Sequence, residues 1–524
     1  MKRPELLDFG QERIKVLHYT WIAFFITFYV WFNMAPMATT MLKDMAWMTK
    51  EHLKILAICN VALTIPARIV IGALIDRFGS RIVFSGLMIF SAIPALFFAF
   101  GDTFVQLLIS RLILGTVGAG FVIGIKMVSQ WFPPKMIGRA EGFYAGWGNF
   151  GSAWAAMTLP WIGITFFGET LGLGTDGWRW ALAFNGLVSL VYGVMYLYLV
   201  KDLPDGKKFV GTKKTTPMMV TSYGDLIQYL VWSVPLVGAM AILTWRISNV
   251  MIGGEPILSE GLALLIYIVL ALIYVAHAFK TLQINLPVLK KGVPEKDKYH
   301  WGSVAALNST YFANFGAELA VVSMLPMFFE TTFRSLTGAD GSTVMTATMA
   351  GIMAASFAFV NLFARPLGGL LSDKMKNRKT TMLVYMIGIT LGFLGMANIA
   401  DYGAGGELVP MVNETWWVGI AVLITVACSM FVQGAEGATF AVIPMVNKKM
   451  TGQIAGMSGA YGNVGAVVYL VIFSLVDAKE FFYIIASGAA LSFLYCLVFL
   501  KEPEGSFSDE LDHSAHEDVA VNQN

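Results

Sequence analysis

The sequence contains two copies of one unusual stretch. Residues 67–81 read ARIVIGALIDRFGSR, and residues 364–378 read ARPLGGLLSDKMKNR, so that seven identical or chemically matched positions recur at a constant offset of 297. In each copy a single arginine stands within an apolar run that ends in a charged loop. A repeat of this length indicates a protein built from two duplicated halves.

A second motif is duplicated independently. Residues 145–151 read AGWGNFG, and residues 459–465 read GAYGNVG. The matched pairs, all at an offset of 314, are Trp147 with Tyr461, Gly148 with Gly462, and Asn149 with Asn463. The offset differs from that of the first motif because loops of the two halves differ in length. The duplication therefore extends over most of the chain.

The composition is that of a protein embedded in lipid. Of the 524 residues, 56% are hydrophobic and 13% are charged, about half the charged fraction of soluble domains. A soluble enzyme, a disordered protein and a disulfide scaffold are excluded. The net charge of +2 gives no reason to expect nucleic acid as a partner. The three cysteines lie in apolar runs without metal-binding or redox spacing, so we predict no cofactor and no metal.

Fourteen apolar runs are long enough to cross a bilayer, which takes about 20 helical residues. Six precede residue 201, six follow residue 301, and two lie between these groups. The predicted spans are 20–41, 54–75, 82–100, 104–129, 140–162, 180–200, 227–246, 260–279, 302–328, 347–371, 381–399, 416–445, 454–475 and 480–500. The fold class predicted from them is an all-α polytopic membrane protein.

Charge sets the predicted orientation. With the amino terminus in the cytoplasm, most of the 36 Lys and Arg residues fall on the cytoplasmic side. We therefore predict a multi-pass protein of the cytoplasmic membrane with both termini inside, acting as a monomer. We divide the chain into an N-terminal six-helix bundle (1–200), a cytoplasmic linker with two additional spans (201–301), a C-terminal six-helix bundle (302–500) and a disordered acidic tail (501–524).

These motifs resemble those of a known family. The loop of residues 72–81, GxLxDRxGxR, resembles the signature of the major facilitator superfamily, in which two six-helix halves alternate access to a site at the membrane midplane. The duplicated Gly/Asn motifs resemble those of the nitrate/nitrite porter family within it. So do Trp131-Phe-Pro, Gly177-Trp-Arg179 and Glu436-Gly-Ala. The resemblance implies twelve spans, and the two central spans are a departure from it.

Arg68 and Arg365 are the central candidates for substrate binding. Each lies eight residues, about 12 Å along a helix, before the acid of its charged loop. A charge at that depth costs several kcal/mol and is usually functional, although an arginine that snorkels to the interface is the structural alternative. No Asp or Glu accompanies either arginine in its own span. An uncompensated guanidinium pair predicts a bound anion.

Further polar groups reach the same depth. Asn149, Asn463 and Tyr311 lie eight or nine residues into their spans, about 12 to 14 Å, and Phe315 shares a helix face with Tyr311. An ordinary core pair is the alternative for these two rings. In the porter family that this chain resembles, the anion lies between two arginines beside a tyrosine of the seventh helix, with aromatic rings around it. The remaining predicted site residues are Trp147, Tyr461, Gly148 and Gly462, of which the glycines also permit close contact between moving helices.

Charged residues at the cytoplasmic helix ends form a second candidate group. In the superfamily that this chain resembles, the signature loop latches the two halves together. The predicted latch residues are Asp76, Arg77, Arg139, Asp373 and Lys374. A simple cluster of cytoplasmic positive charge is the alternative reading for such residues.

Two carboxylates leave the coupling open. Glu318 lies seven residues beyond Tyr311, and Glu436 lies near the middle of its span. A buried carboxyl group with a raised pKa could carry a proton together with the anion. Either could equally be structural, and Glu436 could pair with Lys126 on the symmetry-related helix.

The sequence thus predicts a secondary transporter of nitrate and nitrite that works by alternating access, with the two anions and the lipid bilayer as its partners. A single negative charge between two guanidiniums leaves an excess positive charge, which favours nitrate/nitrite antiport because the empty site would resist occlusion. Nitrate/proton symport is the alternative, followed by transport of another small inorganic or organic anion. No grouping of nucleophile and base lies at a common depth, so we predict no enzyme.

Overall fold

In the part of the chain that the structure describes, fourteen segments form helices that are long and apolar enough to cross a membrane. The computed structural model describes residues 8–132, 134–204, 217–252, 254–295, 298–338, 341–375, 377–447 and 450–502. Each of the fourteen predicted spans coincides with one of these helical segments, so the predicted fold class is confirmed. The predicted acidic tail lies outside the described residues from position 503 onward.

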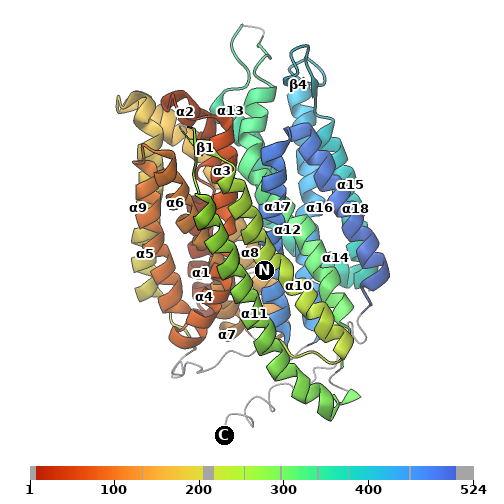
Figure 1. The fold of residues 1–524 in the computed structure, drawn as a ribbon. Coiled ribbons are helices and arrows are strands. Elements are labelled where there is room, and N and C mark those ends of the chain that lie inside the picture. Colours follow the sequence, from red (N-terminus) through yellow and green to blue (C-terminus); the bar gives the residue numbers. More distant parts are fainter. Residues whose placement is uncertain are drawn as a thin grey trace.

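The helices of the first half run from one end of the molecule to the other and back (Figure 1). They are α1 (Glu12–Trp31), η2 (Ala35–Met37), α2 (Ala38–Asp44), α3 (Lys50–Ala62), α4 (Thr64–Phe78), α5 (Ser80–Ala99), α6 (Phe104–Leu114), η3 (Gly115–Ala119), α7 (Gly120–Trp131), α8 (Pro134–Pro160), η4 (Trp161–Thr170), η5 (Gly174–Asp176) and α9 (Gly177–Leu199).

The second half repeats this pattern with fewer interruptions. Its elements are α12 (Trp301–Thr332), α13 (Ala347–Phe359), α14 (Asn361–Met375), α15 (Arg378–Ala397), β3 (Ala400–Tyr402), β4 (Leu408–Pro410), α16 (Trp417–Val446), α17 (Thr451–Leu475) and α18 (Ala478–Phe499). The short strands β3 and β4 pair in a hairpin at the same end of the molecule as α2 (Figure 1). By the predicted orientation this is the outer end.

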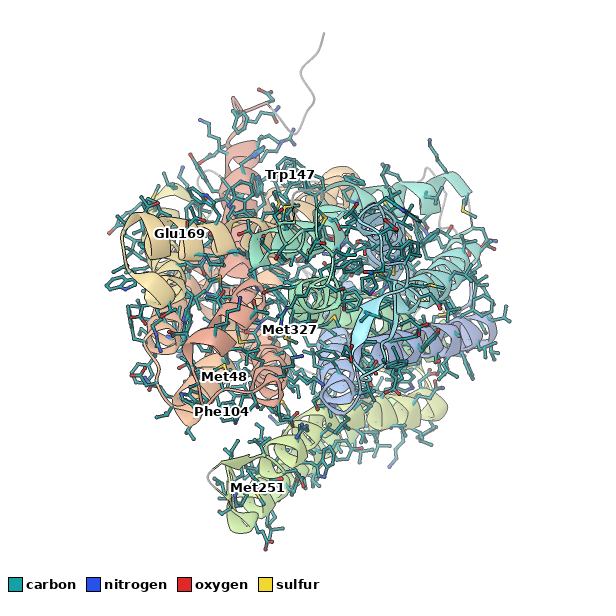
Figure 2. The ribbon with its side chains drawn as sticks, turned by 90° about the horizontal axis from the view of Figure 1, so that it is seen from above. Met48, Phe104, Trp147, Glu169, Met251 and Met327 are labelled. Carbon is teal, nitrogen blue, oxygen red and sulfur yellow. The ribbon has the colours of Figure 1, made fainter. Side chains whose placement is uncertain are left out.

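The two additional spans lie outside the bundle formed by the two halves. They are α10 (Tyr223–Ser248) and α11 (Glu260–Lys291), joined by the strands β1 (Met251–Ile252) and β2 (Glu255–Pro256). Seen from above, they run along one side of the molecule (Figure 2). In the most apolar 18-residue stretch of α11, only 6% of the residues are buried. The outer helix of the pair therefore meets lipid over most of its surface, whereas α10 packs on the bundle through α17, α12 and α3.

The halves meet where glycines remove side chains between helices. A Cβ atom added to Gly146 of α8 would lie 2.7 Å from the backbone oxygen of Asn361 in α14, and one added to Gly351 of α13 would collide with the backbone oxygen of Ala156 in α8. Such close backbone contact is typical of membrane helices that pack through small residues. α4 and α14 each have a lipid-facing side with exposed apolar residues, whereas their arginines, Arg68 and Arg365, are buried.

Candidate functional site

Arg68 and Arg365 occupy equivalent positions in the two halves. Each side chain is only 5% exposed, and each lies five residues after a break in its span, at Leu63 between α3 and α4 and at Val360 between α13 and α14. The snorkelling alternative is excluded, because an arginine that reached the interface would expose its guanidinium. The breaks recur at the same offset as the arginines.

At equivalent positions in the two halves, one backbone carbonyl accepts a hydrogen bond from a side chain and not from the next turn of the helix. In an uninterrupted helix the backbone oxygens of Asn60 and Phe357 would accept from the residues that open α4 and α14. Instead the indole Nε1 of Trp31 donates to Asn60 at 2.6 Å, and the amide Nε2 of Gln433 donates to Phe357 at 2.8 Å. A side chain thus satisfies each carbonyl and stabilises the break that precedes each arginine.

Both guanidiniums lie near one aromatic ring. The Cζ atoms of Arg68 and Arg365 are both 5.7 Å from the ring centroid of Phe315, within the range of a cation–π contact. Tyr311 stacks on Phe315 with their centroids 5.0 Å apart. The structure therefore brings four of the predicted site residues together, from α4, α12 and α14.

Two further rings were not predicted. Phe121 of α7 lies 5.4 Å from the guanidinium of Arg68, and Phe440 of α16 lies 5.2 Å from Tyr311 and 5.7 Å from Phe121. The sequence held a signal for this pair. Residues 118–121 read GAGF and residues 437–440 read GATF, a third duplicated motif with its own offset.

Arg365 forms ion pairs with two carboxylates from other spans. Its guanidinium forms an ion pair with Glu436 of α16 and lies 3.9 Å from Glu318 of α12. Both carboxylates are buried, and the amide of Asn361 donates to Glu318. The prediction of an uncompensated guanidinium pair is therefore wrong for Arg365. It failed because partners on other spans cannot be recognised from one helix alone.

The suggested pairing of Glu436 with Lys126 is also wrong. The side chain of Lys126 is exposed on α7, whereas Glu436 is fully buried beside Arg365. A buried carboxylate requires a cation or several donors, and Arg365 supplies the cation.

Arg68 has a different environment. Its Nη1 donates to the backbone oxygen of Gly459 in α17, and among the described residues no carboxylate forms an ion pair with it. The amide of Asn463 donates to the same oxygen at 3.2 Å. Arg68 of the first half is thereby connected to the second half through one shared carbonyl.

Several buried polar atoms around the arginines have no hydrogen-bond partner among the described residues. The donors among them include Nε and Nη2 of Arg68, Nε and Nη1 of Arg365 and Nδ2 of Asn149, and the acceptors include Oδ1 of Asn149, Asn361 and Asn463, Oε2 of Glu318 and Oε1 of Glu436. Buried donors without acceptors are costly. These donors fit an anion with several oxygen atoms better than a neutral molecule.

The duplicated glycines pack under aromatic rings. A Cβ atom added to Gly462 would lie 2.5 Å from the Phe315 ring and 2.8 Å from the Tyr311 ring. The equivalent Gly148 meets the ring of Phe24 in α1. Gly462 therefore shapes the wall of the site, whereas Gly148 brings α1 against α8.

Trp147 and Tyr461 do not face the arginines. Trp147 packs on Trp21 and Phe143 with centroids 5.2 and 5.3 Å away, on the side of the molecule opposite Met251 (Figure 2). The hydroxyl of Tyr461 donates to the backbone oxygen of Trp232 in α10. Each residue precedes its asparagine by two positions, about 200° around a helix, and so points away from the face that Asn149 or Asn463 presents.

The predicted latch is described only in part. The side chains of Asp76, Arg139 and Asp373 lie outside the described residues, while Arg77 and Lys374 are exposed. The role of these five residues stays a prediction.

Two acids that were not predicted stand at the same helix ends. Asp202 accepts from the backbone N–H of Arg81 at 2.8 Å, and Glu502 accepts from those of Arg378 and Lys379 at 3.0 and 2.7 Å. These N–H groups open α5 and α15, where orphan donors and the helix dipole favour an acid. The pairs Lys201-Asp202 and Lys501-Glu502 were the sequence signal for this duplication.

Comparison with known proteins agrees with this architecture. The family model of the Major Facilitator Superfamily matches residues 20–309 and again residues 307–518. The nitrate/nitrite transporter NrtP of Picosynechococcus sp. is 42% identical over an alignment of 534 positions that covers 95% of this chain and 94% of that protein. The chain belongs to the nitrate/nitrite porter family of the major facilitator superfamily.

Other porters and transporters extend the comparison. The nitrate/nitrite transporter NrtP of Nostoc punctiforme is also 42% identical, over 97% of this chain and 96% of that protein. High affinity nitrate transporter 2.5 of Arabidopsis thaliana is 25% identical, over 89% and 75%. The crystal structure of a D-xylose-proton symporter superposes with a TM-score of 0.60 over 94% of this chain and 99% of that one, at 15% sequence identity. At that identity the superposition shows the fold alone.

Gly462→Ala tests the packing of the site wall. The added methyl group would force the rings of Phe315 and Tyr311 aside, so we expect the free energy of unfolding to fall by about 1 to 3 kcal/mol, the usual cost of overpacking. Thermal unfolding of the purified porter measures this. Gly456→Ala on the same helix is the control, because a Cβ atom there meets nothing within 4 Å. Equal melting temperatures for the two variants would contradict the packing described.

Proposed function

We propose that this porter carries nitrate and nitrite across the cytoplasmic membrane by alternating access between its two halves. The observation that carries the proposal is the pair of buried guanidiniums that both lie near the Phe315 ring, with free donors on both. The names of the two relatives at 42% identity support the choice of anion. We further propose that both termini lie in the cytoplasm, as the distribution of Lys and Arg favours, and that the porter acts as a monomer.

A small planar anion suits the arrangement of donors. A guanidinium presents its N–H groups in one plane and binds two oxygen atoms of a planar anion side by side. The rings of Phe121, Tyr311, Phe315 and Phe440 form the other walls. A larger organic anion or a phosphate would need donors beyond the arginines and the asparagines.

The charge balance favours proton coupling. With Arg68, Arg365, Glu318 and Glu436 all ionised, the formal charges in the site sum to zero, so that no excess positive charge is left over. An arriving anion would make the site negative and would compete with the carboxylates for Arg365. Protonation of one carboxylate removes both obstacles. We therefore propose nitrate/proton symport as the coupling that the geometry supports best.

Nitrate/nitrite antiport is the second candidate. It is favoured by Arg68, which has no carboxylate partner among the described residues and so keeps its positive charge for an exchanged anion. If Arg68 alone decides the charge balance, one anion must replace another before the site can close.

The arginines can be tested by conservative replacement. Arg68→Lys and Arg365→Lys keep the charge and remove the planar fork of donors. We expect each to lower nitrate uptake into proteoliposomes at least tenfold, because charge-assisted hydrogen bonds contribute about 1.5 to 3 kcal/mol. Arg334→Lys, in an exposed position after α12, is the matched control. Uptake that is unchanged in both site variants would contradict nitrate binding by the arginines.

The coupling can be tested with Glu318→Gln and Glu436→Gln. Uptake of nitrate is measured in empty proteoliposomes under an inward proton gradient, with the membrane potential clamped by potassium and valinomycin. We expect the gradient to drive uptake by the unmodified porter, and at least one variant to lose this response while it still exchanges nitrate for nitrite.

Glu414→Gln, in an exposed loop before α16, serves as the control for the two glutamate variants. Uptake that requires internal nitrite and ignores the proton gradient would establish antiport. Absence of flux under both conditions, in a porter that still binds the anion, would contradict transport itself.

A further inference from the structure

The inserted helix α10 is attached to the second half along most of its length. The ring of Trp232 packs on Tyr461 of α17 and Tyr495 of α18, with centroids 5.2 and 5.6 Å away. One turn earlier, Tyr229 packs on Trp301 of α12 at 5.9 Å. These three helices all belong to the second half. α10 also packs on α3 of the first half, but its ring contacts with the bundle are all made with the second half, and we expect α10 to move with that half.

The far end of α10 reaches the first half. Arg246, in the last turn of α10, forms an ion pair with Glu51 of α3, and its Nε donates to the hydroxyl of Ser474 in α17 at 2.7 Å. The side chain of Arg246 is 7% exposed and that of Glu51 is 44% exposed. One guanidinium thus connects α3 of the first half with α17 of the second, at the end where β1 and β4 lie (Figure 1).

A second contact joins the same two helices at this end. Lys54, one turn after Glu51, donates to the backbone oxygen of Val476 at 3.2 Å and lies 4.8 Å from the ring of Phe473. Lys54 therefore ties α3 directly to the end of α17. The ion pair between Arg246 and Glu51 is the polar contact that the inserted helix adds to its packing on α3.

The helices joined here are those that carry the site. α3 continues into α4 with Arg68, and α17 carries Gly459, the backbone partner of Arg68. To open the site toward this end, α3 must move away from α17. Because α10 stays with the second half, Glu51 must then leave Arg246. Separation costs the ion pair, so the ion pair favours closure at this end.

We propose that Arg246 is a latch of the inserted helix pair, which holds the two halves closed at the outer end. This role goes beyond the proposed function, since it concerns the conformational equilibrium of the porter and holds whichever anion is carried. The two additional spans would thus take part in alternating access. In a porter with twelve helices, contacts between the two halves alone would hold this end closed.

The test measures the opening of this end directly, without substrate. Ala46→Cys, in the loop after α2, and Glu414→Cys, in the loop after β4, are spin-labelled in a porter whose three native cysteines are replaced by serine. The distance distribution between the labels is recorded by double electron–electron resonance in nanodiscs. We expect Glu51→Gln and Arg246→Gln each to raise the longer-distance population by about threefold or more, as loss of an ion pair of roughly 0.7 kcal/mol would.

Two controls separate the latch from general damage. Ser248→Ala removes a hydrogen bond within α10 only, to the backbone oxygen of Trp245, and is expected to leave the distances unchanged. The double variant Glu51→Arg with Arg246→Glu restores the ion pair in reverse and is expected to restore the short distance. The proposal is overturned if both glutamine variants keep the original distribution, or if the reversed pair opens as far as the single variants do. Unchanged elution and melting temperature show that each variant is folded.

Discussion

The burial of two permanent positive charges dominates this structure. A guanidinium cannot be neutralised in a protein, and a charge at the centre of a bilayer costs about 3 kcal/mol even on the most lenient scale. Several contacts of Arg68 and Arg365 reduce that cost. The aromatic face of Phe315 contributes to both, and the carboxylates of α12 and α16 contribute to one.

The two halves compensate their buried arginines by different contacts, and this difference bears on function. Arg365 is balanced by Glu318 and Glu436 within its own half, whereas Arg68 borrows a backbone oxygen from the other half. In the symport that we propose, a proton and an anion both act on Arg365, since the proton neutralises a carboxylate partner of Arg365 and the anion takes its place. Arg68 instead responds to separation of the halves, because its hydrogen bond to the backbone oxygen of Gly459 breaks when α4 and α17 move apart.

Features that lie within a single helix could be predicted from the sequence. Span lengths, the duplicated arginines and the stacked pair of Tyr311 and Phe315 follow from hydropathy, offset and helical spacing, and the structure contains them all. Contacts between spans could not be derived that way. The pairing of Glu436 with Arg365 joins residues 71 positions apart on different helices, and the outward direction of Trp147 depends on a helix phase that the motif alone does not give. Duplication preserved the withdrawn carbonyls of Asn60 and Phe357 but not the side chains that satisfy them, so the repeat search could not find Trp31 or Gln433.

The inserted helices show how an added element can act on a duplicated machine. A helix pair that contacted one half alone would move with that half and leave the equilibrium between conformations unchanged. A hairpin bound firmly to both halves would stop the movement. By our proposal α10 avoids both outcomes, because its ring contacts with the bundle lie on the second half, while it meets the first half through packing on α3 and one partly exposed ion pair at its tip. A contact of that size shifts the populations of two states by a small factor and still permits exchange between them. The insertion can therefore adjust the transport cycle without blocking it.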